Sequence, residues 1–180
     1  MSTYIWLLPV IFMFHDMEEI VGAEKWIRNN LDPIIAMHPG AERLLKVYRG
    51  VTTAGFAAAV YEELIVLIVI CCSADFTDVT FFDGLWFGGL VGFTLHLVIH
   101  IAQATLIRRY IPCLITSVIS LPPSIYLISQ CVPLLTFDAL LISGMIVGIV
   151  GVALNLRFAH RIMLHISGSK DCHSTPHAVR

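Results

Sequence analysis

Histidine and glutamate residues stand at helical spacing within apolar stretches of this sequence. His15 precedes Glu18 by three residues and Glu19 by four, and His96 precedes His100 by four. Residues three or four apart lie on one face of a helix, so each group can direct its side chains to one point. Helical bundles build divalent-metal sites from Glu and His at these spacings. The pattern predicts a site for Zn, Fe or Mn with four ligands: His15, Glu19, His96 and His100.

Other titratable residues of the apolar stretches suit acid–base chemistry at such a site. Glu62 and Glu63 are adjacent and therefore about 100° apart on a helix, so one of them is expected to face the site. Together with Glu18 and Glu19 they are the predicted catalytic carboxylates, and Glu18 or Glu19 is expected to act as the base. Asp16 projects away from the histidine and is the weakest member of the set. Three polar residues are predicted to support the site: Gln103, Asn155 and His160.

The composition requires a lipid environment for the elements that carry these residues. Of the 180 residues, 57% are apolar and 13% are charged, and the mean hydropathy is +0.83. A soluble domain carries about 25% charged residues, so a soluble enzyme is excluded and the lipid bilayer is the expected partner. The net charge of −2 and the lack of a basic patch argue against nucleic acid. The cysteines show no CxxC spacing and are expected to fill apolar positions: Cys71, Cys72, Cys113, Cys131 and Cys172.

Five apolar runs are each about long enough to cross ~30 Å of hydrocarbon as a helix. They cover residues 4–23, 51–72, 85–107, 112–132 and 138–160. They predict an all-α polytopic membrane bundle of five helices in one domain, 1–166, followed by a disordered cytoplasmic tail, 167–180. Acidic residues in the first run favour a retained transmembrane helix over a cleaved signal peptide.

The basic residues predict how the bundle is oriented. All eleven lie between residues 24 and 49, at 108–109 or from residue 157 onward, on one side of a five-helix bundle. The positive-inside rule then places the N-terminus outside and the C-terminus inside. Residues 24–49 are expected to lie along the cytoplasmic interface, and the membrane is expected to be the bacterial cytoplasmic (inner) membrane.

Helix depth and small residues predict how the helices meet. With helix midpoints near Met13, Tyr61 and His96, the titratable residues of the first three spans fall within about 10 Å of depth. Each costs ~2.5–3.5 kcal/mol at the bilayer centre, so they are expected to face one polar pocket that opens toward the cytoplasm. Two sets of glycines predict close approach of the third and fifth helices: Gly84, Gly88, Gly89 and Gly92, and Gly144, Gly148 and Gly151.

The segment His15-Asp16-Met17-Glu18-Glu19 has the form H-x-x-E-E. Its position in the first span of a small polytopic protein resembles the HXXEE-domain family of membrane proteins, over about residues 4–165. The resemblance implies no substrate or reaction. The membrane-embedded CAAX-type proteases share paired glutamates and a later histidine. However, Ala23 and Leu67 occupy the positions of their required arginine, and Gly92 replaces their phenylalanine.

The predicted function is a metal-dependent integral membrane enzyme whose His/Glu site opens to the cytoplasmic side. It would act on a lipid or lipid-like small molecule by hydrolysis or oxidation. Two alternatives use the same residues. In one, the protein is a small proton-coupled transporter or metal carrier; in the other, the polar residues have a purely structural role and join the helices.

Overall fold

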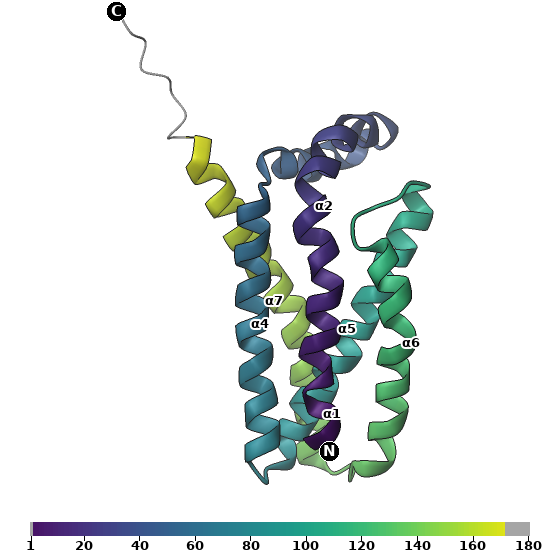
Figure 1. Ribbon diagram of the computed structural model, residues 1–180, viewed down its shortest axis with the longest axis vertical. Helices are drawn as coiled ribbons and strands as arrows, with labels where there is room; N and C mark the ends of the chain where they lie inside the picture. Colours follow the sequence, from purple (N-terminus) through teal and green to yellow (C-terminus); the bar gives the residue numbers. More distant parts are fainter. Residues whose placement is uncertain (1, 172–180) are drawn as a thin grey trace, which may run out of the picture.

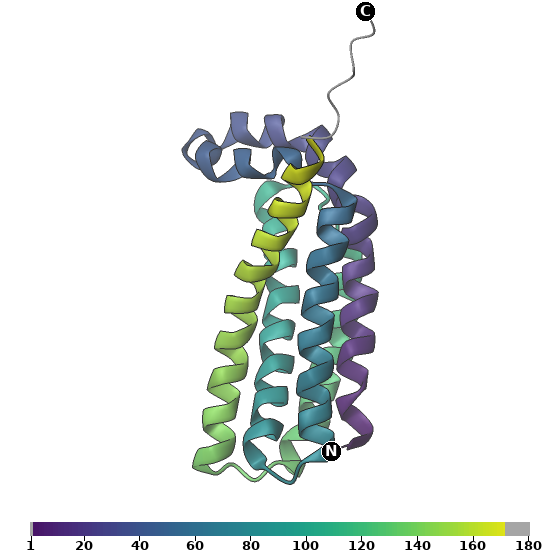
Figure 2. The ribbon, with the colours of Figure 1, turned by 90° about the vertical axis from the view of Figure 1, so that its left-hand side faces the viewer.

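The computed structural model describes residues 2–171, and all regular structure in that part is helical. Five long helices run side by side as an elongated bundle, crossed at one end by short helices (Figures 1 and 2). The long helices are α2 (Leu7–Met37), α4 (Thr53–Phe76), α5 (Thr80–Ile107), α6 (Leu114–Cys131) and α7 (Ala139–Asp171). The short ones are α1 (Ser2–Ile5), η1 (Pro39–Ala41), α3 (Glu42–Leu45), η2 (Lys46–Gly50) and η3 (Val132–Leu134).

Four helical segments are long and apolar enough to cross a membrane, which confirms the all-α polytopic bundle. They are Thr53–Phe76, Thr80–Ile107, Leu114–Leu134 and Ala139–Gly168, and they correspond to the second to fifth predicted spans. α2 is outside this set because of its acidic residues, yet it packs against α4 and α6 along the bundle (Figure 1). That α2 crosses the bilayer stays a prediction.

The helices extend beyond the apolar runs that predicted them. α2 continues to Met37, fourteen residues past the expected end, so the first half of the expected interfacial loop is helical. The segment from Pro39 to Gly50 then crosses the end of the bundle (Figure 2). α7 continues to Asp171, so residues 167–171 of the expected tail are helical, and 172–180 lie outside the described residues. Hydropathy marks only the part of a helix inside lipid, whereas backbone hydrogen bonding continues into polar surroundings.

Glycines bring α5 and α7 into direct backbone contact, as their spacing predicts. A Cβ atom on Gly84 would lie 2.1 Å from the carbonyl oxygen of Leu141, and one on Gly144 would lie 2.1 Å from that of Phe81. Gly89 and Gly151 differ, because a Cβ atom there would meet nothing within 4 Å. The glycines of this helix pair therefore fall into a packing group and a second group that faces open space.

The turn from α5 to α6 folds back toward α2 and contributes to the site. It is bounded by two left-handed residues, Arg108 (φ 55°), which ends α5, and Cys113 (φ 96°), which precedes α6. Inside the turn, the carbonyl oxygen of Tyr110 accepts a hydrogen bond of 2.6 Å from Trp26 Nε1 of α2. The side chains of residues 110 and 113 are thereby held beside α2.

The ends of the bundle differ in charge. The C-terminal ends of α2, α5 and α7 lie at one end, which is the end that carries the described lysines and arginines (Figure 1). The aspartates at 75, 78, 83 and 138 belong to the opposite end.

We expect the basic end to face the cytoplasm, because lysine and arginine are retained on that side during insertion. Reporter fusions after residues 49, 80, 110, 134 and 180 should report inside, outside, inside, outside and inside. A cytoplasmic signal at residue 80 would overturn the five-helix topology.

Candidate metal centre

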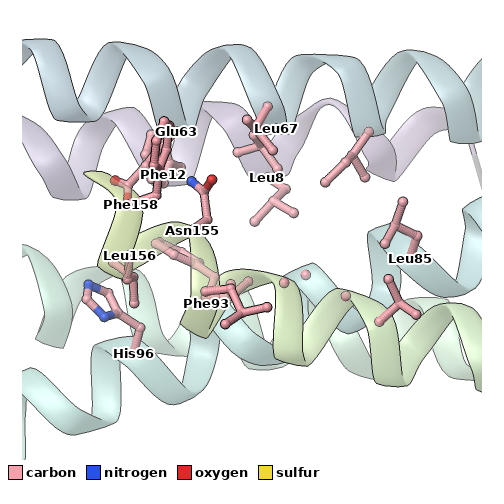
Figure 3. A pocket seen from close by; sticks show the side chains of 18 of the residues that line it. Leu8, Phe12, Glu63, Leu67, Leu85, Phe93, His96, Asn155, Leu156 and Phe158 are labelled. Carbon is pink, nitrogen blue, oxygen red and sulfur yellow. The ribbon is translucent and has the colours of Figure 1, made fainter. Parts of the chain in front are cut away.

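A cavity of about 440 Å³ lies between α2, α4, α5 and α7 (Figure 3). Its lining is apolar along most of its length, with Leu85 toward one end and Glu63, His96 and Asn155 toward the other. Asp16 also lines it. Because the titratable lining residues belong to three helices, the cavity brings together groups that are far apart in the sequence, as the depth argument predicts.

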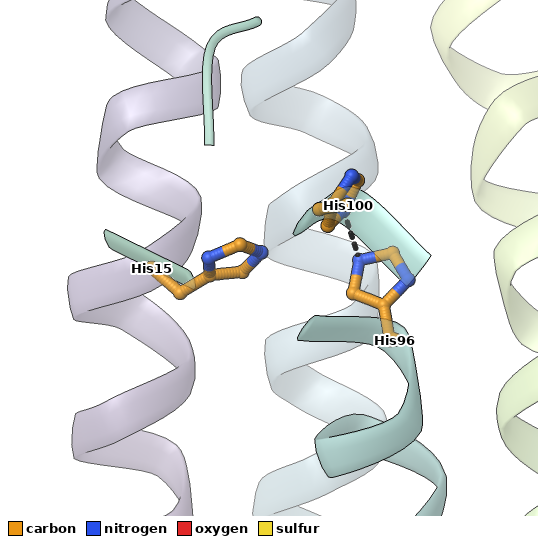
Figure 4. A group of neighbouring side chains, drawn as sticks. All are labelled: His15, His96 and His100. Carbon is orange, nitrogen blue, oxygen red and sulfur yellow. Dashed lines mark hydrogen bonds between the residues drawn. The ribbon is translucent and has the colours of Figure 1, made fainter. Parts of the chain in front are cut away.

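Three imidazoles form a cluster at the polar end of this cavity (Figure 4). His15 projects from α2 toward His96 and His100 of α5, with ring centroids 5.7 and 5.3 Å away. The Nε2 atoms of His96 and His100 are 2.7 Å apart. One ring nitrogen from each of the three histidines lies within 4.8 Å of the others, so all three can reach one ion.

His15 is completely buried, and its two nitrogens have different surroundings. Nδ1 lies 3.3 Å from the hydroxyl oxygen of Thr116 on α6. Nε2 is buried and has no hydrogen-bond partner among the described residues. An unpaired buried polar atom costs about 1–3 kcal/mol, and coordination of a cation by this nitrogen would remove that cost.

Glu19 adjoins the cluster, as the H-x-x-E-E spacing predicts. Its Oε1 atom lies 3.4 Å from His100 Nε2, and the buried Cys113 thiol is its other neighbour. Ligand atoms of Glu19, His100 and Cys113 also lie within 4.8 Å of one another. Burial raises the pKa of the Cys113 thiol well above its usual range, so the sulfur stays protonated beside Glu19. We had expected Cys113 only to fill apolar space. Its place in a turn gives no periodicity from which proximity to Glu19 could be inferred.

Glu18 is bound by the α5–α6 turn and the start of α6. The Tyr110 hydroxyl donates to Oε1 at 2.5 Å, and the backbone N–H and hydroxyl of Thr116 both donate to Oε2 at 2.7 Å. Burial and the neighbouring Glu18 raise the pKa of Tyr110 to about 12, so its phenol stays a donor at neutral pH. Both oxygens of Glu18 are occupied, so its surroundings fit a residue that positions α2 better than they fit the base, the role predicted for Glu18 or Glu19.

Of the other carboxylates, Glu63 and Asp16 line the cavity and Glu62 lies beside Asn155. Glu63 lines the cavity, whereas Glu62 Oε2 lies 3.4 Å from Asn155 Nδ2, within hydrogen-bonding distance. Asp16 is only 4% exposed, and its Oδ2 atom has no partner among the described residues. The sequence predicts Asp16 as the weakest member of the set, because it projects away from His15. Its spacing of four residues from Phe12 and eight from Leu8, which also line the cavity, places it on the cavity face of α2.

The two remaining predicted supporting residues are placed differently. Gln103 Oε1 lies 3.3 Å from His100 Nδ1 and so holds the orientation of that ring. His160 is exposed, its Nδ1 lies 2.6 Å from the carbonyl oxygen of Leu156, and its ring packs against Tyr48. It is outside the three-histidine cluster.

Comparison with known proteins agrees with the motif. The family model described as "Protein of unknown function with HXXEE motif" matches residues 6–127. This chain belongs to the HXXEE family. The match contains the whole histidine cluster and ends within α6, so α7 with Asn155 lies beyond it. No curated protein and no solved structure matches the chain.

The three named positions of the HXXEE motif have three different surroundings in this chain. His15 faces the histidines of α5, Glu19 lies beside His100 and Cys113, and Glu18 binds α6 and the turn before it. The motif thus supplies two potential metal ligands, His15 and Glu19, and one residue, Glu18, that fixes α2 against α6.

Proposed function

We propose that this protein is a metal-dependent membrane enzyme that hydrolyses a lipid-like small molecule. The observation that carries the proposal is the cluster of His15, His96 and His100, in which a buried nitrogen of His15 lacks a partner within the described residues. Hydrolysis requires only water as co-reactant, and we therefore prefer it to oxidation.

The donor set suits a divalent ion such as Zn, Fe or Mn. Tetrahedral ligands about 2.1 Å from zinc lie about 3.4 Å from one another. The Nε2 atoms of His96 and His100 are 2.7 Å apart and would have to separate slightly to bind the same ion. A nitrogen of His15 lies within 4.8 Å of a nitrogen of each of these rings, so it can reach the same ion. Glu19 shares a group with His100 and Cys113 rather than with His15 and His96, so it would have to shift toward the three histidines to become the fourth ligand. Thr116 and Gln103 contact the second nitrogens of two rings and fix their orientation.

The residues that line the cavity have roles in substrate binding and proton transfer. A bound divalent ion would supply Lewis acidity to polarise a carbonyl group. His96 belongs both to the cluster and to the cavity lining, so a substrate in the cavity reaches the metal centre there. Glu63 faces the same space and would take a proton from the attacking water. As the ester C–O bond breaks, Glu63 would return that proton to the leaving oxygen.

The shape of the cavity favours an enzyme over a carrier. A proton or metal pathway needs polar groups that continue toward both faces of the membrane. Here the end opposite the histidines carries Leu85, and Leu8 and Leu67 lie between the two ends (Figure 3). An apolar extension of this kind suits the chain of a substrate.

The proposal predicts that the protein purified without chelator contains about one divalent ion per chain. In nanodiscs it should hydrolyse p-nitrophenyl dodecanoate, lose this activity on chelation and regain it with Zn²⁺, Fe²⁺ or Mn²⁺. Glu63→Gln should bind metal normally and lower the rate about 10²–10⁴-fold, the usual contribution of a general base. Protein that stays metal-free, or turnover that survives chelation, would contradict the proposal.

A further inference from the structure

We infer that the cavity binds a lipid with one apolar chain and a cationic amino head group, and that Asp16 is the counter-ion of that head group. The inference rests on the proposed function, since it names the substrate class of the same site.

The length and lining of the cavity fit one extended chain. The eleven steps along α5 from Leu85 to His96 rise about 16 Å. With carbon–carbon bonds of about 1.5 Å at about 111°, an extended chain advances about 1.25 Å per bond, so about thirteen bonds span this length, close to a dodecyl chain with its head-group atom. Leu67, Phe93 and Val152 are among the apolar side chains between the two ends. The volume of about 440 Å³ lies within the usual range for small-molecule sites, about 300–1,000 Å³.

Two glycines keep this space open. Gly89 and Gly151 line the cavity, and a Cβ atom on either would meet nothing within 4 Å. Neither is required for contact between α5 and α7, in contrast to Gly84 and Gly144. A glycine within a helix costs about 1 kcal/mol relative to alanine. The missing side chains at these two positions leave room for a ligand.

The charge at the polar end selects the head group. Asp16 lines the cavity with a buried, unpartnered Oδ2 atom, and Glu63 and Glu19 are close enough to interact with it electrostatically. The residues that line the cavity include no lysine or arginine. A protonated amine would donate a charge-assisted hydrogen bond to the free acceptor atom of Asp16, a partner that the lining itself does not supply.

The test uses protein in nanodiscs of diacyl phosphatidylcholine and radiolabelled dodecylamine, with empty nanodiscs as background. We expect saturable binding of one dodecylamine per chain, with at least tenfold weaker binding of dodecanol, which has the same chain and an uncharged head group. Equal binding of dodecanol, or an absence of saturable dodecylamine binding, would overturn the inference without the need for any variant.

Two variants test separately the part of the cavity that would hold the apolar chain and the residue that would bind the head group. Gly151→Leu should fill the cavity and weaken dodecylamine binding at least tenfold while metal content stays unchanged. Gly168→Leu, on the same helix and also with nothing within 4 Å of its Cβ position, is the matched control and should bind as the wild type does.

Asp16→Asn should remove the preference for dodecylamine over dodecanol. Wild-type binding by Gly151→Leu or an unchanged preference in Asp16→Asn would contradict the inference, whereas loss of metal from the wild type would contradict only the proposed function.

Discussion

Replacing His15 by alanine is expected to remove almost all metal from the purified protein, and adding His100→Ala should then change little. His15 and His100 come from different helices, and their ring nitrogens lie within 4.8 Å of each other and of His96. Outer-shell changes alone typically cost 10–100-fold in metal affinity, so loss of a ligand should cost at least 100-fold. Residues that act as one unit lose their function together, and the double variant should show strong non-additivity. Metal stoichiometry of the two single variants and the double variant measures this effect.

His160→Ala is the control for that series. His160 is an exposed histidine on α7 outside the cluster, so its replacement should leave the metal content unchanged. If the histidines only joined helices, hydrogen bonds worth about 0.6 kcal/mol each would be lost in additive steps. Additive falls in Tm with no change in bound metal would therefore favour the structural alternative.

The second large effect concerns the contact between α5 and α7. Gly84→Ala is expected to lower stability by about 1–3 kcal/mol or more, the range for overpacked sites. The new Cβ atom would lie 2.1 Å from a backbone oxygen of Leu141, and a backbone atom cannot rotate away. For a chain of this size the fall in Tm is about 2–4 °C per kcal/mol. Thermal unfolding in one detergent, followed by circular dichroism, measures the change.

Gly89→Ala is the matched control, five residues along the same helix. Its Cβ atom would meet nothing within 4 Å, and alanine is the better helix former by about 1 kcal/mol. Its Tm should equal or exceed that of the wild type. Equal losses in both variants would show that the close approach at Gly84 does not limit the stability of the bundle.

Periodicity and hydropathy were sufficient to predict most of the framework. The second to fifth spans were located because about 20 apolar residues are needed to cross a bilayer. The pairing of His96 with His100 follows from the fixed geometry of one turn of helix. The approach of α5 and α7 followed from glycine spacing in the same way. Helix ends were harder to predict, as in α2, because polar residues there are compatible with either helix or loop.

The sequence by itself therefore determined an all-α membrane bundle with histidines and carboxylates inside it. The thickness of a bilayer fixes how many apolar residues a span needs, and the length of a helical turn fixes which side chains share a face. Only the tertiary structure decided which of those residues meet. It bound Glu18 to Thr116 and Tyr110, turned Glu63 rather than Glu62 to the cavity, and brought Cys113 to Glu19. These outcomes depend on the rotation of each helix about its own axis and on the path of the α5–α6 turn. Both are set by packing between segments far apart in the chain, which local spacing does not encode.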